Sequence, residues 1–242
     1  MKTETTPHGN DKDTQRKAFF NDRAATWMDR HYKNHETNAH DRYSDKIMKI
    51  VSTLRIEPNH QILDVGCGSG VLVPYIMEYL SPKGRLFEMD YAREMIVANQ
   101  KRHTDERITF ICSDVLEIPF EPGSLDIIIC FACFPHFQDQ KEALKRMSKR
   151  LKPKGRLTIA HLMSSEEIAR HHNGESAVSR DTLPTKKEME AHVKDAGLTI
   201  TAFTDEPGNY LLSLEKGLSE MVCKQTSNTI VQQEMSSFQQ IN

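Results

Sequence analysis

Short apolar runs alternate along this chain with segments whose apolar residues recur every three or four positions. The runs lie at 61–65, 85–89, 108–111, 125–131 and 157–160. Continuous apolar runs of this length are typical of parallel strands buried on both faces, whereas a period near 3.6 is typical of helices. The alternation predicts an α/β fold, with helices on both faces of a parallel sheet.

The helical periods precede and separate these runs. We expect helices from about Thr14, over 43–54, 71–80 and 92–103, and around Leu144–Leu151. Two further helices begin at capping boxes, Ser164 with Glu167 and Thr185 with Glu188. The segments 198–204 and 210–215 predict two more strands, joined by a turn at 205–209.

The first apolar run leads into a glycine-rich turn, Asp64-Val65-Gly66-Cys67-Gly68-Ser69-Gly70. A strand, a glycine turn and a helix open many nucleotide-binding α/β folds, because glycines let a ligand approach the backbone closely. Asp64 stands two residues before the first glycine. A carboxylate there repels a pyrophosphate but suits a cationic ligand such as S-adenosylmethionine.

This turn resembles motif I of the class I S-adenosylmethionine-dependent methyltransferases. Asp90, Asp114 and the fourth and fifth strands follow in that family's order, so the resemblance covers about residues 18–216. It implies a Rossmann-like methyltransferase fold: an α/β, doubly wound, mostly parallel seven-stranded sheet with an antiparallel C-terminal hairpin. Residues 19–28 are similar to a segment that covers the active site in the ubiquinone/menaquinone-biosynthesis group, although an aromatic stripe packed on the core is the alternative.

The resemblance implies a set of S-adenosylmethionine-binding residues at the carboxyl ends of the strands. Asp90 is expected to accept hydrogen bonds from the ribose hydroxyls, with a structural helix N-cap as the alternative. Asp114 is expected to take the adenine amino group, or to be a turn residue without a ligand. Asp126, at the amino end of its strand, is expected to be structural. The full set is Asp64, Gly66, Cys67, Gly68, Gly70, Asp90, Tyr91, Met95, Asp114, Val115 and Phe131.

Four histidines follow the strands near the expected transfer site: His136, His161, His171 and His172. Three interpretations stay open. His136 or His161 is a catalytic general base for an oxygen, carbon or sulfur acceptor. Alternatively, the histidines bind substrate or pack, and alignment alone drives transfer. In the third, His136, His161 and His171 or His172 form a metal site that holds a thiolate-type acceptor, although no close histidine spacing supports it.

Charge and composition indicate which classes of binding partner to expect. The 242 residues carry a net charge of −2, from 32 basic and 34 acidic residues. This balance gives no argument for nucleic acid, and no apolar run reaches membrane-spanning length. Five cysteines, four of them in expected strands or the glycine turn, favour a reducing compartment. We therefore expect a cytoplasmic enzyme with a small-molecule methyl acceptor; the oligomeric state is not indicated.

We expect four regions along the chain. Residues 1–17 form a disordered N-terminus, and residues 18–57 form helices that cover the site. Residues 58–216 form the cofactor-binding core with a lid insertion at 163–183, and residues 217–242 form a helix or tail. Two other functions are weighed. A non-catalytic S-adenosylmethionine-binding protein is consistent with every motif, whereas Asp64 and the terminal hairpin disfavour a nicotinamide-dependent oxidoreductase.

Overall fold

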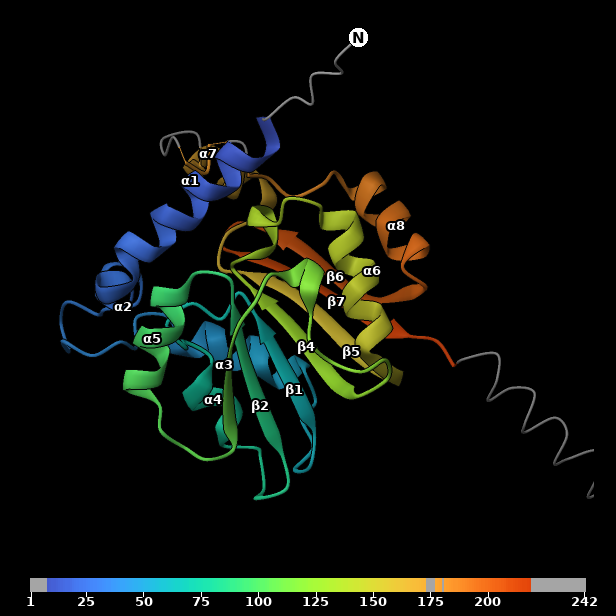
Figure 1. Cartoon of the computed structure of the whole chain (residues 1–242), viewed down its shortest axis with the longest axis horizontal. Helices are drawn as coiled ribbons and strands as arrows, with labels where there is room; N and C mark the ends of the chain where they lie inside the picture. Colours follow the sequence, from blue (N-terminus) through green and yellow to red (C-terminus); the bar gives the residue numbers. More distant parts are fainter. Residues whose placement is uncertain (1–7, 173–176, 180, 219–242) are drawn as a thin grey trace, which may run out of the picture.

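The computed structural model describes residues 8–172, 177–179 and 181–218, with the side chains of residues 8–11 excepted. It contains a seven-stranded sheet in the order β3-β2-β1-β4-β5-β7-β6 (Figure 1). The strands are β1 (Gln61–Val65), β2 (Arg85–Asp90), β3 (Ile108–Cys112), β4 (Leu125–Phe131), β5 (Leu151–His161), β6 (Leu198–Glu206) and β7 (Asn209–Lys216).

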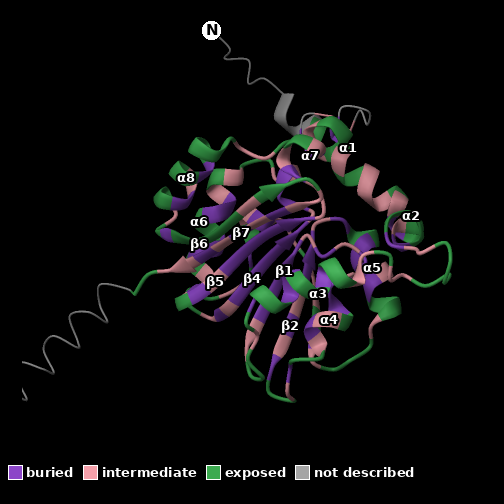
Figure 2. Ribbon diagram, turned by 180° about the vertical axis from the view of Figure 1, so that it is seen from behind, coloured by how far each residue is buried: buried purple, intermediate pink, exposed green. Residues whose placement is uncertain are grey.

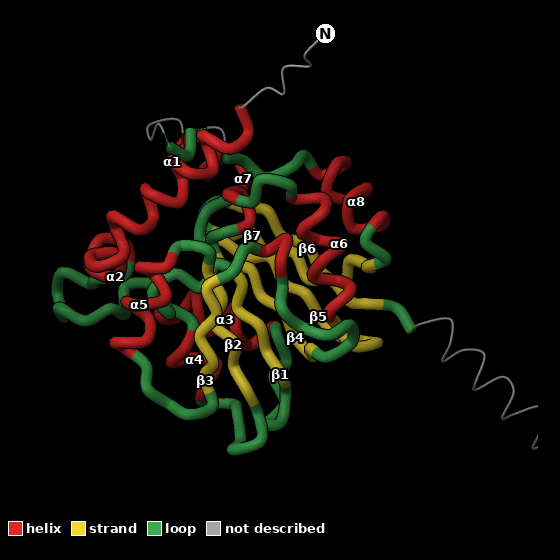
Figure 3. Tube along the Cα trace, in the orientation of Figure 1, coloured by secondary structure: helices red, strands yellow, loops and turns green. Residues whose placement is uncertain are grey.

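Helices lie on both faces of this sheet (Figure 3). The α-helices are α1 (His8–Arg23), α2 (Trp27–His31), α3 (Ser44–Thr53), α4 (Val73–Met77), α5 (Arg93–Arg102), α6 (Gln140–Arg150), α7 (Ser165–His172) and α8 (Lys186–Asp195). Three short 3-10 turns are η1 (Ala24–Thr26), η2 (Val115–Glu117) and η3 (Phe134–His136).

The sheet confirms the predicted fold class. β1 pairs with β2 and β4 in parallel, β2–β3 and β4–β5 are parallel, and β7 pairs antiparallel with β5 and β6. β4 covers the residues predicted for it, and all but Asp126 of its seven residues are buried. Two-sided burial is what a continuous apolar run predicts for a central parallel strand.

Two apolar layers flank the sheet, and successive strand residues point into opposite layers. Leu63 and Ile128 pack with α6 and α8 on one face. Ile62 and Ile127 pack with α3 and α4 on the other. The middle strands are accordingly the most deeply buried part of the molecule (Figure 2). This rigid double layer holds the strand ends, and the loops after them, in fixed positions.

The N-terminal boundary differs from the prediction of disorder over residues 1–17. Helix α1 already begins at His8, and residues 1–7 lie outside the described residues. Apolar periodicity begins only further along the chain, whereas Arg16 anchors the earlier turns through an ion pair with Asp181. α1 and α7 lie side by side beyond one end of the sheet (Figure 1).

Two other boundaries differ. The helix predicted over 71–80 spans only α4, with Pro74 in its first turn. β5 begins six residues before the predicted start at Leu157 and includes Lys154 at a φ of 62°. Part of the expected lid and most of the 217–242 segment lie outside the described residues. Within the described part of the chain, no helix is both long and apolar enough to cross a bilayer.

Candidate active site

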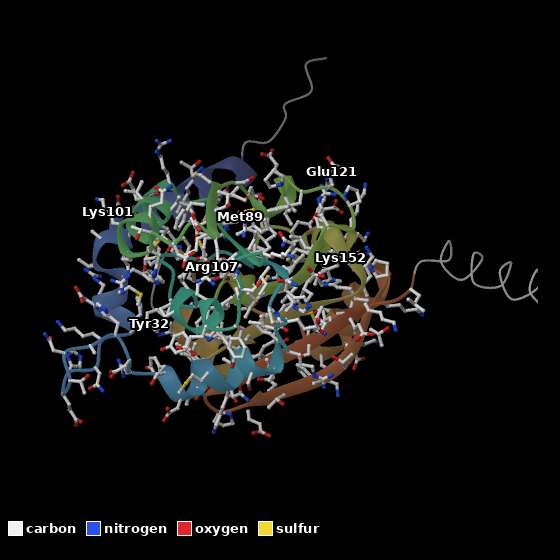
Figure 4. The ribbon with its side chains drawn as sticks, turned by 90° about the horizontal axis from the view of Figure 1, so that it is seen from below. Tyr32, Met89, Lys101, Arg107, Glu121 and Lys152 are labelled. Atoms are coloured by element: carbon white, nitrogen blue, oxygen red, sulfur yellow. The ribbon has the colours of Figure 1, made fainter. Side chains whose placement is uncertain are left out.

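A cavity opens where the first four strands end, beside the N-terminal helices. Nine of the predicted cofactor residues line it: Gly66, Cys67, Gly68, Asp90, Tyr91, Met95, Asp114, Val115 and Phe131. Asp64 and Gly70 do not line it, although both belong to the same strand and turn. Met89, which also lines the cavity from β2, is buried near the middle of the molecule (Figure 4).

The glycine turn folds back onto the end of β2. The N–H groups of Gly66 and Cys67 donate to the Met89 carbonyl at 2.7 and 3.1 Å. Gly66, Gly68 and Gly70 have φ values of 67°, 54° and 83°, a region that residues with a side chain rarely adopt. A Cβ at Gly70 would also overlap the Asn99 amide. The glycines therefore serve the turn's shape and its close packing.

Asp90 ties the turn to the second strand. Its Oδ2 accepts a hydrogen bond from the Gly68 N–H at 2.9 Å, and its Oδ1 accepts from the Ala92 N–H at 2.8 Å. Burial raises the pKa of this carboxyl to about 6, and the backbone N–H donors oppose that rise. Ala92, not Asp90, is the N-cap of α5, so the N-cap alternative was wrong. Asp90 lines the cavity and keeps further acceptor capacity.

Beneath the turn lies a buried pair of carboxyl groups. Asp64 and Glu88 are register partners on β1 and β2, and are 1% and 0% exposed. Glu88 accepts a hydrogen bond from Asn99 Nδ2 at 2.7 Å, but neither oxygen of Asp64 has a partner among the described residues. Burial, followed by Glu88, raises the pKa of Asp64, and burial raises the pKa of Glu88 to about 8. Such an orphaned carboxyl beside an open backbone turn fits a cationic nucleoside.

The third strand contributes the far wall. Asp114 caps η2, where its Oδ1 accepts from the Leu116 N–H at 2.7 Å, and both Asp114 and Val115 line the cavity. Asp126 lies at the other end of the sheet, where it accepts from the Gln61 N–H and from Lys152 Nζ, each at 2.8 Å. Figure 4 shows Lys152 well separated from Tyr32 of the cavity wall. Asp126 is therefore structural, as predicted.

The N-terminal helices supply an aromatic wall. Phe20, Trp27 and Tyr32 line the cavity, and the rings of Phe20 and Trp27 lie 5.7 Å apart, edge to face. The helical spacing of Phe20 and Trp27 indicated a stripe, and the stripe faces the cavity while it packs on the core. Asp13, which also lines the cavity, was missed because no pattern distinguishes it from other polar helix residues.

His136 also lines the cavity and belongs to a chain of contacts that the sequence did not reveal. Its Nδ1 lies 2.8 Å from Asp181 Oδ2. Arg16 donates to both oxygens of Asp181, from Nε at 2.8 Å and Nη2 at 2.7 Å. The Phe20 ring packs edge-on against the His136 ring at 5.1 Å. These hydrogen bonds lower the pKa of Asp181 although its burial acts in the opposite direction.

The other three candidate histidines, His161, His171 and His172, do not line the cavity. His161 does not line the cavity; its Nδ1 accepts from the Met163 N–H at 3.1 Å, and burial lowers its pKa to about 3. His172 lies 5.0 Å from His136 between ring centres, and its Nδ1 bonds to the Asp181 carbonyl. His171 lies 5.9 Å from His172. Among the described residues, no three histidine, cysteine or acidic side chains are arranged to hold a metal ion.

Comparisons with known proteins show which proteins parts of this chain resemble. Residues 63–159 match the family described as a methyltransferase domain. A malonyl-[acyl-carrier protein] O-methyltransferase of Priestia megaterium is 29% identical over 134 residues, which cover 52% of this chain and 48% of that protein. A demethylmenaquinone methyltransferase of Staphylococcus epidermidis is 29% identical over 107 residues, 44% of each chain. The aligned part thus spans about half the length of these relatives.

Solved structures support the fold. One chain of the complex between the Haloferax volcanii Trm112 methyltransferase activator and a methyltransferase superposes with a TM-score of 0.67. It is 19% identical, and the match covers 82% of this chain and 98% of that one. At this identity the likeness concerns the arrangement of strands and helices alone.

Proposed function

We propose that this chain, whose residues 63–159 match a methyltransferase domain, is a class I S-adenosylmethionine-dependent enzyme that transfers a methyl group to a small-molecule acceptor. S-Adenosylmethionine is the cofactor of that domain. When bound, it supplies an activated methyl group on a good leaving group. The chain's own task is to hold the cofactor, align the acceptor and remove the acceptor's proton where it has one.

The cofactor side of the cavity has a distinct role for each strand end. Asp90 accepts hydrogen bonds from the ribose hydroxyls through lone pairs that the backbone donors leave free. Asp64 lies under the glycine turn, where burial raises the pKa of its carboxyl group; a cation bound beside the turn would favour the ionised form, because the low dielectric strengthens the attraction. Asp114 and Val115 contact the base, and the apolar surfaces of Met95 and Tyr91 cover the nucleoside.

His136 is the base in this proposal. It lines the cavity, and its Nδ1 is engaged by Asp181, which leaves Nε2 as the nitrogen that accepts a proton. His161 is less suited, because its Nδ1 accepts a backbone hydrogen bond and burial disfavours its protonation. A base is needed for a hydroxyl or ring-carbon acceptor, whereas a carboxylate, such as the free end of the malonyl group in the name of one relative, is already ionised at neutral pH and needs none.

The observation that carries the proposal is the cavity at the ends of β1–β4, with Asp90 bound to the glycine turn beside an unpartnered Asp64. Calorimetric titration with S-adenosylhomocysteine tests it, with NADH as the competing ligand. We expect saturable binding of the first and none of the second. Methyl transfer is then measured as the label that passes from labelled S-adenosylmethionine into the small-molecule fraction of a cell extract. Binding of NADH alone would overturn the proposal, and cofactor binding without any transfer would indicate a sensor.

A further inference from the structure

Three side chains from distant parts of the sequence meet beside the cavity, and of these three His136 lines it. Arg16 comes from α1, His136 from η3, and Asp181 from the segment after α7. Arg16 and Asp181 are 165 residues apart in sequence, and His136 and Asp181 are 45 residues apart. Their side chains are only 11%, 15% and 6% exposed, respectively. A bidentate arginine–carboxylate pair with this little exposure fixes both partners in one geometry.

Asp181 is an acceptor only, because Arg16 and His136 keep it ionised against the effect of burial. A carboxylate cannot donate, so the Nδ1 of His136 must carry the proton in the 2.8 Å contact. The neutral ring then has its lone pair on Nε2. Asp181 thus sets the tautomer of His136, and Arg16 sets the position of Asp181.

Other charged and titratable groups surround this chain of contacts. Asp13 lies 3.5 Å from Arg16, and Tyr91 also interacts with Arg16 and with Asp181. His172 packs on the His136 ring and bonds to the backbone of Asp181. His161 and His171 lie within electrostatic range of this pair. Asp181 therefore supplies the carboxylate that is in hydrogen-bond contact with the His136 ring. The His172 ring also packs against that ring.

We propose that Asp181 and Arg16 are positioning residues for His136, so that docking of α1 on the 181 segment completes the base. This inference rests on the proposed methyl transfer. The acceptor's X–H bond breaks as its proton moves to Nε2, and the ring becomes an imidazolium whose Nδ1–H still bonds to Asp181. The charge that forms on the ring lies against a carboxylate already in place, and the proton later leaves Nε2 for solvent.

The first test measures the tautomer and needs no acceptor. Nitrogen-15 NMR of histidine-labelled full-length protein, assigned with His136→Gln, should show neutral His136 with its proton on Nδ1. Asp181→Asn should abolish that preference, and Asp195→Asn, which alters an exposed carboxylate paired with Lys141, should not. A proton on Nε2 of the wild-type ring, or an unchanged tautomer in Asp181→Asn, would overturn the proposal.

The second test measures turnover. Asp181→Asn should lower kcat about 100-fold or more at neutral pH and move the acid limb of the pH–rate profile to lower pH, because the imidazolium loses its ionic partner. Affinity for S-adenosylhomocysteine should stay within about two-fold. Arg16→Ala should lower kcat about ten-fold, Arg16→Lys should restore part of it, and Arg146→Ala, at an exposed pair with Glu142, should change nothing.

The two proposals fail in different ways. Normal turnover in Asp181→Asn would overturn the positioning role while methyl transfer stands. Absence of transfer in the wild-type protein, with His136 still holding its proton on Nδ1, would overturn the enzymatic function and leave the structural role of Asp181. A loss of cofactor affinity in Asp181→Asn equal to its loss of turnover would show that the residue maintains the whole cavity and would overturn the specific role.

Discussion

Asp64 and Asp181 are both buried carboxyl groups close to one cavity, which neither of them lines, yet their surroundings are opposite. Asp64 is 1% exposed, and neither of its oxygens has a partner among the described residues. Asp181 is 6% exposed and receives hydrogen bonds from Arg16 and His136. Burial raises the pKa of the first, whereas the partners lower the pKa of the second against the effect of burial. Partners, rather than depth, decide which of the two carries its charge.

The difference separates two ways of building a site. At the glycine turn, the protein holds an acid without a partner among the described residues, and in our proposal that partner is the cation of a ligand. Beside His136, the protein supplies both partners itself, so that end is arranged before any acceptor arrives. We therefore expect substitutions at the first end to act on cofactor binding and those at the second to act on turnover.

The largest effect on binding is expected at Asp90, which lines the cavity and anchors the turn. Asp90→Ala removes the ribose acceptor and two backbone hydrogen bonds, and should weaken S-adenosylhomocysteine binding by more than about ten-fold. Isothermal titration calorimetry measures it, with Asp195→Asn as the control. An unchanged dissociation constant would remove Asp90 from the ribose site.

A smaller effect is expected at Asp64, because its charge acts from beneath the turn. Asp64→Asn should weaken S-adenosylhomocysteine binding about five-fold to ten-fold, since the carboxyl group has no partner to lose in the free protein. The same substitution at Asp181 should leave the affinity within about two-fold. Equal losses of affinity in Asp64→Asn and Asp181→Asn would contradict the expected difference between the two carboxyl groups.

The smallest effect is expected on stability, from Glu88. Its pKa is about 8 in the folded protein, against an ordinary value of 4.5, so between pH 5 and 8 only the folded chain holds this proton. The free energy of unfolding should therefore fall as pH rises through that window and level off above it. Glu88→Gln should be close to wild type in stability at pH 5 and more stable than wild type at pH 8.5, where the wild-type protein has lost this contribution.

Urea unfolding at the two pH values measures the Glu88 effect. Glu121→Gln, at an exposed position (Figure 4), is the matched control and should follow wild type at both. If Glu88→Gln were instead less stable than wild type at pH 8.5, the carboxylate form would be the favoured one in the fold, and the contrast with Asp181 would have the wrong sign.

The sheet and the cofactor end followed from local patterns. The five parallel strands are apolar runs, and Asp90 and Asp114 lie within three residues of the ends of such runs, so position in the chain was enough to place them at one edge. Phe20 and Trp27 were placed on one face by helical spacing, although their exposure to the cavity was only one of two alternatives.

Of the three side chains that meet at His136, the sequence predicted a role for His136 alone. His136 was predicted because it follows a buried strand, but Asp181 lies in a segment with no apolar period and no motif. Its role depends on Arg16, in a part of the chain where disorder was expected. No window of sequence contains both residues, so only the folded chain reveals their contact.

The 165 residues that separate Arg16 from Asp181 in sequence also determine the order in which parts of the site can form during synthesis. The glycine turn, Asp64 and Asp90 have all been synthesised once the chain has grown past β3, so that half can begin to form while synthesis continues. The contact between Arg16 and Asp181 can form only when α1, which is synthesised early, meets the segment after α7, which is synthesised much later. In a nascent chain, the residues on β1 and β2 that we propose to bind the cofactor are therefore complete before Arg16 and Asp181 can meet.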